Sequence, residues 1–282
     1  MAPARFGPAA VERMVDLGEV TCRVVEQGSG PPILFIPGGD YKAELYLEQV
    51  NALSDQYRCI VFDPRGVGQT KSPSPPWTMA DFAADCASLI RHLDLEKTFL
   101  CGMSMGAQIV LQTTIDYPDL VRVAIPIASP AHLGPGFAMD MMNAEIELRR
   151  TGVTLPAIYQ ALHFAAMYYP SSALSDPDLW NQIKAELMEQ FDGRSADQLI
   201  AQWQPCLGFD CREELRTCCV PIHVIAFEQD LMTPPSECRG VSDLAPRGAF
   251  HVLEDMGHAS MRLHRPERLT KKIVEILSAC NA

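Results

Sequence analysis

The sequence predicts an α/β fold: a mostly parallel central sheet with helices on both faces, and a helical insertion between two of its strands. Short apolar runs alternate with stretches of helical periodicity over the first half of the chain. The alternation stops after residue 128, and strand-like runs return only near residue 222. Since 282 residues can bury one sizeable core, we expect a core formed by 1–128 and 217–282, with an insertion at 129–216.

The strands of the predicted core are short and apolar, as is typical of strands buried on both faces of a parallel sheet. An alternating strand at 20–26 opens the pattern, and Gly28-Ser29-Gly30-Pro31 forms a turn after it. Further strands are expected at 33–36, 58–62, 98–101, 121–127, 222–227 and 249–253. Helices are expected at 43–54, 79–93, 105–117 and 266–279. Strands that alternate with helices in this way form parallel βαβ units.

The charge balance of the chain excludes some classes of partner. Acidic residues outnumber basic ones by 35 to 23, which gives a net charge of −12. A surface this acidic repels phosphate backbones and anionic lipids, so we expect neither nucleic acid nor a membrane as a partner. No apolar run is long enough to span a bilayer, and Met1–Arg13 lacks the apolar segment of a secretory signal. We therefore expect a cytoplasmic protein.

The ten cysteines are expected to be mainly reduced and structural. The chain contains no C-x-x-C pair and no Cys/His spacing that matches a zinc site. Cys59 and Cys101 lie within strand-like apolar runs, where a thiol packs as a small apolar group. We therefore expect no bound metal.

One motif carries a specific chemistry. Gly102-Met103-Ser104-Met105-Gly106 has the form G-x-S-x-G, and it lies directly between a predicted strand and a predicted helix. A sharp turn at this point holds a serine in a strained conformation at the carboxyl edge of the sheet, where its hydroxyl projects outward. A helix N-cap is the structural alternative for this serine. The context favours Ser104 as a nucleophile.

A serine nucleophile needs a base and an acid that orients the base. Of the seven histidines, His258 lies in a loop just past the last predicted strand, which is the edge that also carries Ser104. Asp230 follows the strand at 222–227, and Glu228 competes with it from two positions away. We favour Asp230 because it lies deeper in its loop, and a surface histidine and a capping carboxylate remain the structural alternatives.

Backbone N–H groups are expected to stabilise a developing oxyanion near Ser104. Met105, directly after the serine, offers one donor, and Gly39 in the loop after the strand at 33–36 offers the second. Asp40, Ser129 and Met232 adjoin these loops and are candidate substrate-binding residues.

Taken together, these segments resemble the α/β-hydrolase fold family. The similar motifs are the serine motif, the Asp63-Pro64-Arg65-Gly66-Val67-Gly68 segment, Asp230 before Thr233-Pro234, and Gly257-His258. The resemblance covers residues 20 to 280 and is closest to esterase, enol-lactonase and C–C hydrolase members, whose helical cap would correspond to 129–216. Pro37-Gly38 stands where the family often has His-Gly, and Phe227-Glu228 stands where a glycine is more usual.

The resemblance implies a serine hydrolase that cleaves a small-to-medium apolar carboxylic ester or lactone, without a metal or organic cofactor. Two other functions stay open on the same scaffold. One is a non-hydrolytic cyclase or acyltransferase of small-molecule biosynthesis, and the other is a ligand receptor with little turnover. Substrate identity and oligomeric state do not follow from the sequence.

Overall fold

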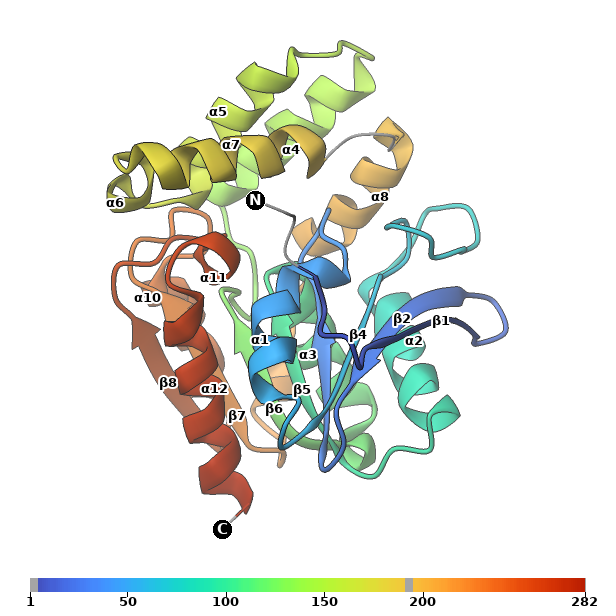
Figure 1. Cartoon of the computed structure of the whole chain (residues 1–282). Helices are drawn as coiled ribbons and strands as arrows, with labels where there is room; N and C mark the ends of the chain where they lie inside the picture. Colours follow the sequence, from blue (N-terminus) through green and yellow to red (C-terminus); the bar gives the residue numbers. More distant parts are fainter. Residues whose placement is uncertain (1–4, 191–194, 282) are drawn as a thin grey trace.

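The computed structural model describes residues 5–190 and 195–281, and its centre is an eight-stranded sheet (Figure 1). The strands are β1 (Val11–Asp16), β2 (Thr21–Gln27), β3 (Pro32–Ile36), β4 (Arg58–Phe62), β5 (Thr98–Met103), β6 (Val121–Ile127), β7 (Ile222–Phe227) and β8 (Gly248–Leu253). Their order is β1-β2-β4-β3-β5-β6-β7-β8. The six strands from β4 to β8 in this order are parallel, whereas β1 and β2 are antiparallel to their neighbours. The predicted, mostly parallel sheet is confirmed.

Helices cover both faces of the sheet, and each face has its own apolar core. One core joins the sheet to α1 (Leu47–Leu53) and α12 (Pro266–Asn281). The other joins it to α2 (Met79–His92), α3 (Met105–Asp116) and α10 (Pro235–Leu244). The α/β architecture therefore follows from buried strands that need apolar helices on both sides.

A helical insertion separates β6 from β7. It contains α4 (Phe137–Arg150), α5 (Ala157–Tyr168), α6 (Ser171–Leu174), α7 (Pro177–Gln190), α8 (Ala196–Leu207) and α9 (Arg212–Leu215). In Figure 1, α4 to α8 lie together at one end of the sheet. Their apolar core includes Phe164 and Trp203, and it also takes in Met232 after β7 and Ala259 after β8. The insertion therefore packs on the loops at the carboxyl ends of the strands.

Two core elements and one boundary differ from the sequence prediction. β1 was missed because it lies at the sheet edge with most of its side chains exposed, so it has no apolar run. α10 was missed because its apolar positions are few and Pro234 and Pro235 precede them. The helix predicted at 43–54 is a 3₁₀ turn, η1 (Ala43–Tyr46), followed by the shorter α1.

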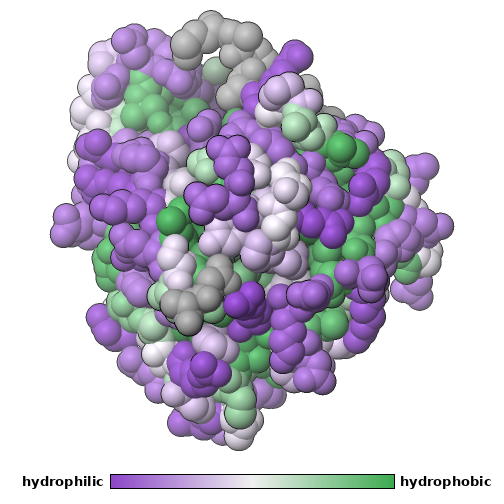
Figure 2. Space-filling model, turned by 60° about the horizontal axis from the view of Figure 1, so that its bottom comes forward, coloured by the Kyte–Doolittle hydropathy of each residue, from purple (hydrophilic) through white to green (hydrophobic). Residues whose placement is uncertain are grey.

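The surface is mixed in character. Hydrophilic residues spread over the face shown in Figure 2, where smaller hydrophobic areas interrupt them. Within the described ranges 5–190 and 195–281, no helix combines the length and the apolar character that crossing a membrane requires.

Candidate functional site

Ser104 lies in a tight turn between β5 and α3. Its φ and ψ are 55° and −120°, a strained conformation for a residue with a side chain. The turn brings α3 so close to the sheet that only glycine fits on either side. A Cβ on Gly102 would collide with the carbonyl of Gly106, and a Cβ on Gly106 would collide with the carbonyls of Ile36 and Pro37. The sequence motif is therefore required by the packing.

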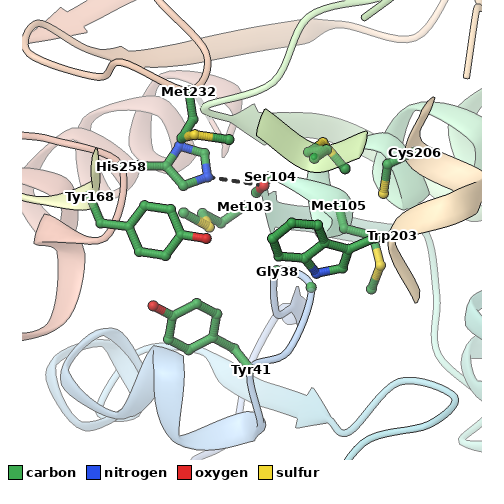
Figure 3. Close-up of a pocket in the computed structure, with 12 residues that line it drawn as sticks. Gly38, Tyr41, Met103, Ser104, Met105, Tyr168, Trp203, Cys206, Met232 and His258 are labelled. Atoms are coloured by element: carbon green, nitrogen blue, oxygen red, sulfur yellow. Dashed lines mark hydrogen bonds between the residues drawn. The ribbon is translucent and has the colours of Figure 1, made fainter. Parts of the chain in front are cut away.

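His258 lies in the loop after β8, and its ring faces the serine (Figure 3). Its Nε2 is 3.1 Å from Ser104 Oγ, and its side chain is almost fully buried. The insertion helps to hold this loop, because Ala259 N donates to the carbonyl of Tyr168 at the end of α5 at 3.1 Å. The rings of Tyr168 and His258 also pack together, with their centroids 5.4 Å apart.

Asp230 is the carboxylate that reaches His258. Its Oδ2 is 2.7 Å from His258 Nδ1 and accepts from the hydroxyl of Thr233 at 2.9 Å. Its Oδ1 accepts from the N–H groups of Met232 and Thr233 at 2.8 and 2.9 Å. A carboxylate is an acceptor only, so Nδ1 carries the ring proton and Nε2 is left to accept a proton from the serine hydroxyl.

Glu228, the competing carboxylate, points elsewhere. It is exposed, and its Oε2 accepts from the backbone N–H of Asp255 at 3.0 Å. The structure thus brings Ser104, His258 and Asp230 together in one hydrogen-bonded chain and leaves Glu228 on the surface. Asp230 is buried, with 3% of its surface exposed.

Two adjoining cavities open at Ser104. They share six lining residues: Ser104, Met105, Met142, Cys206, Met232 and His258. The first, which we call the aromatic lobe, is also lined by Gly38, Gly39, Tyr41, Met103, Tyr168 and Trp203. The second, the α3 lobe, is also lined by Gln108, Ser129, Pro130, Leu133, Ala138 and Thr233. Ser104 and His258 lie at the junction of the two lobes.

The predicted donors of an oxyanion site are close to the serine. Gly39 lines the aromatic lobe, and an added Cβ there would lie 3.8 Å from the Cβ of Met105. Met105 is the first residue of α3, so its N–H has no acceptor within the helix. Gly39 and Met105 thus lie near each other on the wall of the lobe that Ser104 also lines.

The three candidate substrate-binding residues have different surroundings. Ser129 lines the α3 lobe, and Met232 lines both lobes. Asp40 instead contacts the insertion: its Oδ2 accepts from Trp203 Nε1 at 2.8 Å and lies 3.7 Å from the guanidinium of Arg149. Asp40 N donates to Gln202 Oε1 at 2.8 Å, so this residue ties the Gly39 loop to α8.

The lining of both lobes carries no lysine, arginine, aspartate or glutamate. Burial raises the pKa of Tyr168 well above its usual value and that of Cys206 to about 12, so both keep their protons at neutral pH. Across the part of the chain that the structure describes, no group of three or more His, Cys, Asp or Glu side chains is placed to hold a metal ion. The pocket is uncharged apart from the His258–Asp230 pair.

Several pocket residues escaped sequence reasoning. Tyr168 and Trp203 stood out only as aromatic residues among helix formers, and such residues more often pack in a core. Tyr41 and Gln108 carried no signal beyond their closeness to the Gly39 loop and to Ser104. In Figure 3, Tyr168 and Trp203 lie to the left and right of Ser104, and Tyr41 lies below them.

The family model described as alpha/beta hydrolase fold matches residues 31–264, and the chain belongs to this family of enzymes. BpoC of Mycobacterium tuberculosis, a protein named as a non-heme bromoperoxidase, is 31% identical over 260 residues, which are 91% of this chain and 97% of BpoC. The crystal structure of BpoC matches 93% of this chain and 97% of its own, with a TM-score of 0.82 and 28% identity. The 3-oxoadipate enol-lactonase 2 of Acinetobacter baylyi is 22% identical over 90% of this chain and 91% of the lactonase.

Proposed function

We propose that this chain is a serine hydrolase that cleaves a small-to-medium, mostly apolar carboxylic ester or lactone. The observation that carries the proposal is the hydrogen-bonded chain from Ser104 to His258 to Asp230, with distances of 3.1 and 2.7 Å. A serine hydroxyl is a poor nucleophile until a base takes its proton, and here a buried carboxylate fixes the base in the required tautomer.

The reaction has two halves. Ser104 Oγ attacks the substrate carbonyl while His258 Nε2 takes the hydroxyl proton, and the N–H groups of Gly39 and Met105 donate to the oxyanion. His258 then gives the proton to the leaving oxygen, and an acyl-enzyme remains on Ser104. A water molecule attacks this ester with His258 again as the base, which releases the acid and restores the serine.

The two lobes support the substrate class. Their walls are apolar or neutral, as is typical of a site for a small apolar molecule. The insertion at 129–216 acts as a cap over the core formed by 1–128 and 217–282, and it supplies Tyr168 and Trp203 to the pocket. The name of the enol-lactonase relative is consistent with this class. We also propose a cytoplasmic location, which is supported by the burial of eight of the ten thiols as small apolar groups.

A panel of neutral esters and lactones incubated in ¹⁸O-labelled water tests the proposal. Hydrolysis through an acyl-enzyme places one labelled oxygen in the product acid, whereas cyclisation or transfer to another acceptor does not. We expect labelled acid from the wild type and none above background from Ser104→Ala. Unlabelled products, or equal activity in Ser104→Ala, would contradict the proposed reaction.

A further inference from the structure

Gln108 is a polar residue in an apolar position. It lies on α3 among Ala107, Ile109 and Val110, and only 4% of its surface is exposed. Its side-chain Oε1 has no hydrogen-bond partner among the residues that the structure describes. A buried carbonyl oxygen without a partner destabilises a fold, so the position of Gln108 needs an explanation.

Another buried glutamine shows what a structural role looks like in this chain. The side-chain amide of Gln202 uses both of its polar atoms to join separate elements: Nε2 donates to the carbonyl of Arg65 at 2.6 Å, and Oε1 accepts from the N–H of Asp40 at 2.8 Å. Gln108 joins no such elements through its Oε1.

The location of Gln108 points to a ligand. It is four residues after Ser104 on the same helix, and its backbone N–H donates to the carbonyl of Ser104 at 3.2 Å. Side chains four apart lie on one face of a helix and lean toward its N-terminus, so Gln108 leans toward the serine. It also lines the α3 lobe, whose remaining walls are mostly apolar.

We propose that the side-chain amide of Gln108 hydrogen-bonds a neutral polar group of the substrate in the α3 lobe, and so makes Gln108 a specificity-determining residue. The inference rests on the proposed hydrolase function and narrows its substrate class. The unpartnered atom of Gln108 is its acceptor oxygen Oε1, which suits a hydroxyl or an amide N–H of the substrate. A carboxylate in this lobe would be desolvated without a cation beside it, because neither Lys nor Arg is among the described residues that line the lobe.

Matched ester pairs test the assignment. In each pair one ester carries a hydroxyl group near the end of its chain, and the other has the plain alkyl chain of the same length. One series varies the acyl portion and a second varies the alcohol portion, because either portion can enter the α3 lobe. Gln108→Met keeps the side-chain length and removes the amide. The matched control is Gln112→Met. Gln112 is half-buried on the same helix, and its side chain donates to Asp116.

We expect the wild type to prefer the hydroxyl-bearing ester in one series, as judged by kcat/KM. Gln108→Met should reduce this preference about tenfold, the size of one neutral hydrogen bond, while Gln112→Met leaves it unchanged. Gln108→Leu provides a second apolar variant should the first not fold.

The outcomes separate this inference from the hydrolase proposal. If both series are hydrolysed and Gln108→Met and Gln108→Leu keep the wild-type preference, the role of Gln108 is overturned. The hydrolase proposal would still stand. Failure of the folded wild type to hydrolyse any ester, with Ser104 unreactive, would overturn both.

Discussion

Replacing Asp230 with asparagine tests how the base is held. Asp230 accepts four hydrogen bonds, from His258 Nδ1 at 2.7 Å, from the N–H groups of Met232 and Thr233, and from the Thr233 hydroxyl. An asparagine has only one oxygen. Whichever way this amide turns, its NH₂ group faces donors that the Asp230 carboxylate accepts from in the wild type.

The favoured arrangement in Asp230→Asn keeps the oxygen toward the two backbone N–H groups, since these are fixed. The NH₂ group then faces His258 Nδ1, which must give up its proton and accept. The ring proton moves to Nε2, 3.1 Å from Ser104 Oγ, so the ring can no longer take the serine proton. A wrong tautomer of this kind lowers kcat about 10⁴-fold, which corresponds to about 5 kcal/mol of transition-state stabilisation.

The assay is steady-state hydrolysis of the best ester found, with Glu228→Gln as the matched control. Glu228 is exposed and its side chain accepts from the N–H of Asp255, away from His258, so we expect the kcat of Glu228→Gln to stay within about threefold of wild type. Unfolding in urea should show both variants folded. A kcat for Asp230→Asn near the wild-type value, or a larger loss for Glu228→Gln, would refute the assignment of Asp230.

Three further predictions concern the fold. Gly106→Ala should destabilise the protein by more than about 3 kcal/mol, since its Cβ collides with the carbonyls of Ile36 and Pro37, whereas Gly240→Ala, in open space, should be nearly neutral; urea unfolding distinguishes them. In the folded protein at about pH 8, a thiol reagent should react quickly with Cys219 and Cys280 alone, because burial raises the pKa of thiols such as Cys59 and Cys86 to about 12; rapid labelling of all ten would contradict this. Burial lowers the pKa of His223 and His251 below the ordinary 6.5, so the unfolded chain takes up protons first and stability should fall as the pH drops through that value. The free energy of unfolding, measured at about pH 7.5 and 5.5, should drop less for His251→Gln than for wild type. An equal drop would contradict a contribution of His223 and His251 to the loss of stability.

The position of the candidate site was predictable because it depends on the order of strands and loops along the chain. Ser104 follows directly after β5, Asp230 comes three residues after the end of β7 and His258 five residues after the end of β8, and parallel strands present their carboxyl ends at one edge. The apolar runs that define those strands are visible in the sequence. We favoured Asp230 over Glu228 because Asp230 lies deeper in the loop after β7. In the structure, Asp230 Oδ2 lies 2.7 Å from His258 Nδ1.

Most of the pocket was not predictable beyond loop neighbours such as Ser129 and Met232, because it depends on contacts between distant segments. Trp203 reaches Asp40 across 163 positions of sequence, and Tyr168 contacts His258 across ninety. Helical periodicity shows that such residues are buried but does not show against what. Gln108 illustrates the same point, since an interior glutamine is unusual but its environment is defined by α4 and the loop after β6. β1 lacked a signal for a different reason, because an exposed edge strand needs no apolar run.

The most direct test of the central claim is intact-mass analysis after treatment with a fluorophosphonate probe, applied to wild type and Ser104→Ala. We expect a single adduct on the wild type and none on Ser104→Ala, because only a serine activated by His258 at an open pocket reacts with such a probe. A folded wild type that gains no adduct, or a Ser104→Ala variant that gains the same one, would contradict the claim that Ser104 is the nucleophile.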